Sequence, residues 1–153
     1  YFDLKHNIQS DIIFDWEKMF ALNGDSGPYL QYTYARARSI LRKVASQELL
    51  LRTHLRTQEQ LLKNEELAIL RYLYQFPEVV EQAAKQYSPN LVCSYLFELA
   101  KRFNSFYNNC RILDQDDGEN RENRGFRLEL TGAVSVVLKN GLTLLGIEAP
   151  EKM

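Results

Sequence analysis

Apolar residues recur at intervals of three and four positions through most of the chain, and strict apolar–polar alternation is scarce. The first spacing is typical of helices with one buried face, whereas alternation would indicate strands. The sequence therefore predicts an all-α fold, a helical bundle. The expected helices are residues 10–21, 28–45, 46–63, 64–76, 77–88, 89–113 and 126–140.

The start of the helix at 28–45 carries the clearest local signals. Gly24 lies in a predicted turn, and Asp25 or Ser26 can cap the helix N-terminus. Pro28 falls in the first turn, where its missing N–H costs no hydrogen bond. These residues predict a helix that begins close to position 28.

The last third of the chain is divided by a polar stretch. Residues 114–125 hold seven charged residues, two glycines and no apolar residue, which predicts a solvated loop before the final helix. Asn140 and Gly141 are expected to cap that helix. The tail at 141–153 is too apolar to remain free, so we expect it to dock back onto the bundle.

Length and composition are those of one ordinary domain, with 153 residues, 45% apolar and 25% charged. No run of 18 apolar residues and no signal-peptide pattern is present, so neither membrane insertion nor secretion is expected. The chain begins with Tyr, which suggests a piece of something longer. Cys93 and Cys110 are 17 positions apart in one predicted helix, or about 25 Å, so no disulfide is expected between them.

The net charge of −1 conceals one basic block, because residues 26–58 carry +5. Within it, Tyr29, Tyr32, Arg36 and Lys43 fall within about 80° of one another on a helical wheel, beside the apolar stripe. Tyrosine rings stack on unpaired bases and cations hold phosphates, so this edge is suited to single-stranded nucleic acid. The alternative is that the tyrosines are half-buried rim residues and the bases a solvated face.

Other chemistry finds little support in the sequence. Two histidines and no Cys-x-x-Cys pair provide too few ligands for a zinc site, and no metal site is expected. The carboxylates of 114–125 have no apolar surroundings for acid–base work, and Gly125 stands where a calcium loop needs glutamate. No phosphate-binding glycine motif or nucleophile set is present, so no catalytic residue is expected.

The stretch GDSGPYLQYTYARARSILRK resembles the start of the helical, DALR-type anticodon-binding domain of arginyl-tRNA synthetases. The resemblance continues in order through PEVVEQAA, YLFELAKRFNSFYNNCRIL and RLELTGAVSVVLKNGLTLLGIEAPEKM. Upstream, SDIIFDWEKM is similar to the segment that links the class I catalytic domain to the helical domain. The resemblance thus implies a linker at 1–22 and an anticodon-binding domain at 23–153.

This resemblance implies an activity that the chain does not hold alone. The family joins arginine to its tRNA with ATP and magnesium, and its HIGH and KMSKS signatures are absent from these residues. We therefore expect a fragment without a cofactor of its own and without activity, whose catalytic domain lies elsewhere in the same polypeptide. Its implied partner is the anticodon loop of arginine-accepting tRNA, and we expect a cytoplasmic monomer without membrane contact.

The resemblance also places the anticodon contacts on the tyrosine-bearing edge derived above. Tyr107 would be the residue that stacks on an anticodon base, and the terminal Met153 would pack beside the tyrosines. Tyr34 stands where many relatives have histidine, but it lies off this edge. The implied contact residues are Tyr29, Tyr32, Arg36, Arg42, Tyr107, Asn109 and Met153.

A second hypothesis belongs to a different class of function. The apolar residues of 1–22 can form an exposed interface, which would suit a non-catalytic helical module for protein interaction or assembly. Self-association without RNA binding would favour this hypothesis.

Overall fold

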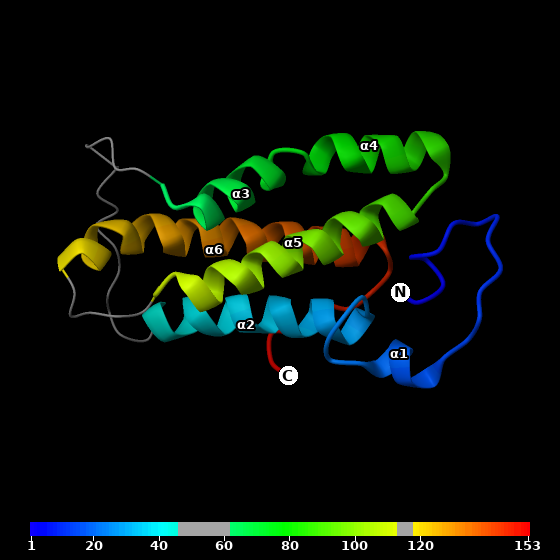
Figure 1. Ribbon diagram of the computed structural model, residues 1–153, viewed down its shortest axis with the longest axis horizontal. Helices are drawn as coiled ribbons and strands as arrows, with labels where there is room; N and C mark the ends of the chain where they lie inside the picture. The colour runs from blue at the N-terminus through cyan, green and yellow to red at the C-terminus, as the bar shows by residue number, and fades with distance from the viewer. Residues whose placement is uncertain (46–61, 113–117) are drawn as a thin grey trace.

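The computed structural model describes residues 1–45, 62–112 and 118–153. Its described part is helical and contains no strand, which confirms the predicted all-α fold (Figure 1). None of the described helices is long and apolar enough to cross a bilayer. The helices are α1 (Trp16–Phe20), α2 (Gly27–Ala45), α3 (Asn64–Leu73), α4 (Phe76–Gln86), α5 (Asn90–Asn109) and α6 (Gly118–Leu144).

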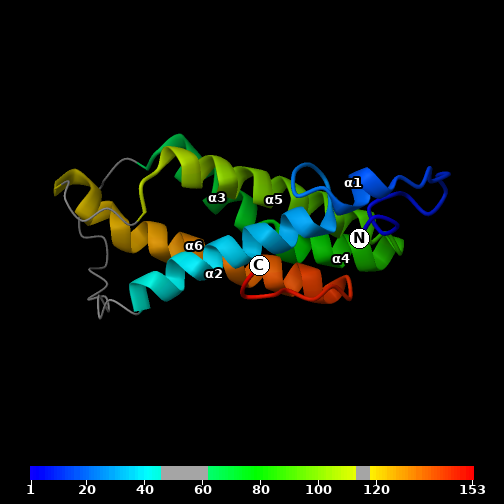
Figure 2. The same cartoon turned by 90° about the horizontal axis from the view of Figure 1, so that it is seen from below.

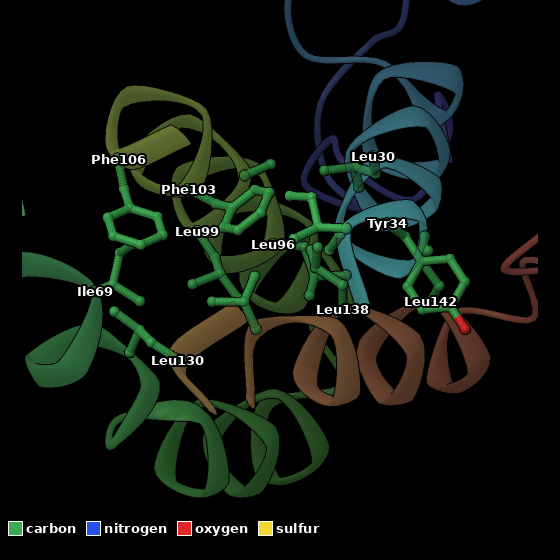
Figure 3. Close-up of a cluster of buried hydrophobic side chains, with 14 of the residues drawn as sticks. Leu30, Tyr34, Ile69, Leu96, Leu99, Phe103, Phe106, Leu130, Leu138 and Leu142 are labelled. Carbon is green, nitrogen blue, oxygen red and sulfur yellow. The ribbon is translucent and has the colours of Figure 1, made fainter. Parts of the chain in front are cut away.

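Helix α5 is the centre of the bundle and contacts α2, α3, α4 and α6. Helices α2 and α5 run in the same direction and α6 runs opposite to them, while α3 and α4 cover the side away from α2 (Figure 1). The regular apolar stripe of α5 is therefore covered from several sides. Figure 3 shows the resulting core, formed by Leu30, Tyr34, Ile69, Leu96, Leu99, Phe103, Phe106, Leu130, Leu138 and Leu142.

The start of α2 follows its sequence signals. The Ser26 hydroxyl accepts a hydrogen bond from the backbone N–H of Tyr29 at 3.2 Å and donates one to the carbonyl of Ala21. Of the two predicted caps, Ser26 is therefore the one used. Pro28 lies in the first turn of the helix as predicted.

Helix α6 corrects two predictions. Residues 118–125 belong to it, so the predicted loop at 114–125 is wrong there, and 114–117 lie outside the described residues. Most residues of this charged stretch are glutamate, arginine and asparagine, and the first two favour helix, so the stretch can be helical without apolar residues.

The predicted cap at Asn140-Gly141 is also wrong, because α6 continues to Leu144. A Cβ on Gly141 would lie 2.4 Å from a methyl carbon of Leu96, so this glycine allows α5 and α6 to approach closely. The cap lies instead just beyond Leu144, at Gly146, where φ is +71° and the N–H of Ile147 bonds to the carbonyl of Leu142 at 2.9 Å. This is a Schellman cap with glycine in the left-handed conformation.

The N-terminal segment is less helical than predicted. Instead of a helix at 10–21, only Trp16–Phe20 is helical, with the Asp15 side chain capping it at the N–H of Lys18. Apolar side chains here face solvent, including Ile13 at 89% exposure and Trp16 at 64%. Tertiary burial that would hold a longer amphipathic helix is thus lacking. The domain boundary at residues 22 and 23 stays a prediction.

The central helices lie where the sequence places them, with shifted ends. Helix α3 begins at the predicted residue 64 but ends at Leu73 and not at 76, and α4 covers Phe76–Gln86 where 77–88 is predicted. Helix α5 ends at Asn109, before the predicted 113, and Cys110 is extended. The predicted helix at 46–63 falls almost entirely outside the described residues.

A buried ion pair joins three parts of the fold. Arg127 of α6 and Glu66 of α3 are each 1% exposed, and the Arg127 Nε lies 2.7 Å from a Glu66 carboxylate oxygen. Arg127 also donates to the carbonyl of Arg111, after α5, at 2.8 Å. The second Glu66 oxygen accepts from the N–H of Lys63 at 2.9 Å. These contacts satisfy both charges in the core.

Candidate nucleic-acid interface

One face of the bundle brings the basic edge of α2 beside α5. The Arg36 guanidinium carbon lies 4.7 Å from the ring centroid of Tyr32, one turn earlier on α2. The same carbon lies 5.1 Å from the ring centroid of Tyr107, on α5. The structure thus brings one cation together with two rings. Arg36 and Tyr107 are 71 positions apart in the sequence. We call Tyr32, Arg36 and Tyr107, with the residues that hold them, the tyrosine surface.

Both rings of the tyrosine surface are accessible. Tyr32 and Tyr107 are each 40% exposed, so part of each ring faces solvent and part packs on the protein. Hydrogen bonding from Arg36 and its positive charge lower the pKa of the Tyr32 hydroxyl. The Arg36 guanidinium is therefore close enough to Tyr32 to favour the ionised form of its hydroxyl, and cation–π attraction to the ring favours this placement.

Tyr29 has a different environment from Tyr32. Its ring packs edge-on against Phe97 of α5, with 5.8 Å between centroids. Its hydroxyl accepts a hydrogen bond from the Asn104 side chain at 2.9 Å. Tyr29 therefore connects the two helices at the base of the tyrosine surface, with less of its ring available for stacking.

Asn104 is the residue of this surface that sequence reasoning missed. It lies on α5 three positions before Tyr107 and contacts three side chains of α2. The available signal is an amide directly beside the core residue Phe103, on a helix edge shared with Phe97 and Tyr107. The spacing alone does not reveal which helix it faces.

Arg42 lies on another stripe of α2, about 120° from the tyrosine edge. Its guanidinium donates to the carbonyl of Glu151 at 2.7 Å, and Arg38 pairs with the Glu151 carboxylate at 3.0 Å. Gln31 donates to the carbonyl of Glu148 at 2.7 Å. These bonds hold the C-terminal tail along α2 (Figure 2), which confirms the predicted docking of the tail.

The remaining two predicted contact residues are also placed by the structure. Met153, at the end of the tail, is 62% exposed. The Asn109 side chain donates to Glu65 of α3 at 3.2 Å, so it faces α3 while Arg36 sits against Tyr107. The structure thus gathers Tyr29, Tyr32, Arg36 and Tyr107, whereas Arg42 and Asn109 bond to the tail and to α3. The place of Met153 beside the tyrosines stays a prediction.

The described residues contain no group of three or more His, Cys, Asp or Glu side chains suited to a metal ion. Both cysteines are free and buried, and burial raises the pKa of the Cys93 thiol to about 11. Neither thiol is placed for nucleophilic chemistry.

Comparison with known proteins identifies the family of the chain. The model of the family "DALR anticodon binding domain" matches residues 30–153. The chain is 46% identical over its whole length to an arginine–tRNA ligase of Fusobacterium nucleatum, and 39% identical to one of Parabacteroides distasonis. It covers 26% and 25% of these proteins, so it spans about a quarter of the length of the curated relatives it matches.

Solved structures give the same result. The arginyl-tRNA synthetase of Thermus thermophilus superposes with a TM-score of 0.79 at 31% identity, over 98% of this chain and 25% of that one. The arginyl-tRNA synthetase of Plasmodium falciparum superposes with a TM-score of 0.79 at 28% identity, over 99% of this chain and 26% of that one.

Proposed function

Because the chain belongs to the DALR anticodon binding domain family, we propose that it is the anticodon-binding part of an arginine–tRNA ligase. It binds the anticodon loop of arginine-accepting tRNA, and the tyrosine surface is the contact. The observation that carries this proposal is the Arg36 guanidinium lying against both the Tyr32 and the Tyr107 ring. A cation and two accessible rings on one face combine the two kinds of contact that unpaired RNA needs.

Each partner of the surface has a defined task in this proposal. Unstacked bases rest on the exposed parts of Tyr32 and Tyr107, and each stacked base contributes about 1–3 kcal/mol. Arg36 attracts the neighbouring phosphates, and its planar guanidinium can stack on an aromatic ring. Arg38 and Arg42 contribute less, because Glu151 already pairs with both.

The complete ligase performs the chemistry elsewhere. We propose that a catalytic domain in the same polypeptide attaches arginine to tRNA with ATP and magnesium, and that the present residues position the tRNA for it. The 153 residues contain neither HIGH nor KMSKS, so the chain alone is expected to bind RNA without aminoacylating it. We also propose that the protein is a cytoplasmic monomer.

The test measures binding of the anticodon stem-loop of arginine-accepting tRNA by fluorescence anisotropy at several salt concentrations. Tyr32→Ala and Arg36→Ala are each expected to weaken binding about 5- to 100-fold. Arg36→Ala should also lower the slope of log affinity against log salt by about one unit, since one phosphate contact is lost.

Matched controls lie on helices that cover the opposite side of the bundle. Arg71 and Tyr74 are exposed side chains of the α3 region, so Arg71→Ala and Tyr74→Ala should leave binding unchanged. Wild-type affinity in both Tyr32→Ala and Arg36→Ala would refute the proposed surface.

The second candidate function rests on the exposed apolar side chains before α2. Ile13, Trp16 and Leu22 are 89%, 64% and 63% exposed, which favours contact with another protein surface. Analytical ultracentrifugation separates the two functions. Concentration-dependent self-association together with no RNA binding would favour an assembly module.

A further inference from the structure

Asn104 lies between α2 and α5, directly beneath the tyrosine surface, and is half-buried. Its side chain makes three hydrogen bonds to side chains of α2. One Arg36 N–H lies 2.7 Å from the Asn104 oxygen, and the Asn104 nitrogen lies 2.9 Å from the Tyr29 hydroxyl and 3.2 Å from the Thr33 hydroxyl. One amide thus links a cation, a phenol and an alcohol.

The orientation of this amide follows from chemistry. A guanidinium can only donate, so the Asn104 atom that faces Arg36 must be the carbonyl oxygen. The amide NH2 must then face Tyr29 and Thr33, and both hydroxyls accept from it. The Thr33 proton is directed to the Tyr29 carbonyl at 2.9 Å, which leaves its oxygen free to accept. Every contact in this network therefore has one donor and one acceptor.

The network determines where two RNA-facing groups lie. Arg36 is a long side chain with many rotamers, and holding its guanidinium between two rings costs conformational entropy. The bond to Asn104 supplies this restraint before RNA arrives. Because the Tyr29 oxygen accepts from Asn104, its own proton is directed away from the amide and can be donated to a ligand.

We infer that Asn104 is the positioning residue of the anticodon-binding surface, which holds Arg36 between Tyr32 and Tyr107 and aims the Tyr29 hydroxyl in the RNA-free protein. This inference rests on the proposed function, because it assigns how that surface is prepared. RNA then meets a surface that is already arranged, so less of the binding free energy is spent on ordering side chains. Asn104 itself acts through Arg36 and Tyr29.

The experiment is a double-mutant cycle on the full 153-residue chain, with the anticodon stem-loop of arginine-accepting tRNA as the probe. Asn104→Ala should weaken binding about tenfold, as expected for loss of a hydrogen bond to a charged group. In the Arg36→Ala background, Asn104→Ala should weaken binding clearly less than tenfold, because Asn104 then has no guanidinium to hold and acts only through the Tyr29 hydroxyl. Ser105→Ala, at the neighbouring exposed position, is the matched control and should bind as wild type.

A second measurement does not depend on RNA. The Arg36 guanidinium lowers the pKa of Tyr32, so freeing this side chain should raise the Tyr32 pKa toward the ordinary tyrosine value of about 10. NMR titration of ring-labelled tyrosine measures this shift in Asn104→Ala, with Tyr32→Phe to assign the signal. A merely structural loss of packing at Asn104 would leave the Tyr32 pKa unchanged.

Each outcome decides one of the two claims. Wild-type binding by Asn104→Ala, while Arg36→Ala weakens it, would overturn the positioning role and keep the proposed surface. Wild-type binding by Asn104→Ala, Arg36→Ala and Tyr32→Ala together would overturn the surface as well. Additive losses in the cycle, or an unshifted Tyr32 pKa, would show that Asn104 does not act through Arg36. If Asn104→Ala fails to fold, Asn104→Gln, which keeps the amide one methylene further out, is measured in the same cycle.

Discussion

Removing Arg127 should destabilise the fold more than removing any exposed cation. Arg127→Met keeps much of the volume but leaves the Glu66 carboxylate, which is 1% exposed, without its cation. It also deprives the Arg111 carbonyl of its bond at 2.8 Å. The variant therefore places an uncompensated negative charge in the core.

The magnitude follows from this burial. Breaking a buried ion pair by removing one partner costs about 3–5 kcal/mol, a large part of the about 5–15 kcal/mol of total stability of a domain. For a chain of this length, 1 kcal/mol corresponds to a shift of the melting temperature of about 2–4 °C. Arg127→Met is thus expected to melt about 6–20 °C below the wild type.

Urea unfolding followed by circular dichroism measures the loss, and the paired replacement tests its cause. Replacing both partners, as Glu66→Met/Arg127→Met, removes the unpaired charge, so the double variant should be more stable than Arg127→Met. Arg38→Met is the partly exposed control, since its partner Glu151 is half in solvent, and it should cost about 1 kcal/mol or less. A loss below about 1 kcal/mol in Arg127→Met, or a double variant that is less stable than Arg127→Met, would refute the reasoning.

Two further predictions concern buried positions. Gly141→Ala should destabilise by about 1–3 kcal/mol in thermal unfolding, because its Cβ would lie 2.4 Å from Leu96. Gly132→Ala has open space at its Cβ and should stabilise by about 0.5–1 kcal/mol. Equal effects at the two sites would contradict this reasoning. Cys93 and Cys110 should not react with a disulfide reagent at pH 8 in the native state, since both are buried and the Cys93 pKa is raised to about 11, and both should react after unfolding. Rapid native labelling would show that these thiols are accessible.

Much of the fold could be predicted from local patterns. The period of the apolar residues predicts α2, α3, α4 and α5 because each helix must bury one face, and Ser26 with Pro28 marks where α2 begins. The same reasoning is wrong for 118–125, because a run of charged residues without apolar ones predicts a loop although glutamate and arginine also favour helix. It is also wrong for most of 10–21, where the apolar side chains stay largely exposed instead of burying one helix face in the core.

The candidate site could be predicted in part. The wheel placed Tyr29, Tyr32 and Arg36 on one edge of α2 because residues three and four positions apart share a helix face. The position of Tyr107 beside Arg36 came only from the resemblance to a family, since no local pattern relates α5 to α2. The role of Asn104 was missed for the same reason.

The sequence by itself determined the helical fold, the basic block and the aromatic edge of α2, because these depend on residues that are close along the chain. Only the tertiary structure decided which partners the edge has. It joined Asn104 to Arg36, tied Arg42 to the tail instead, and enclosed Arg127 with Glu66. The physical reason is that contacts between helices depend on how each helix is rotated and packed against the next, and this is settled by the whole core at once.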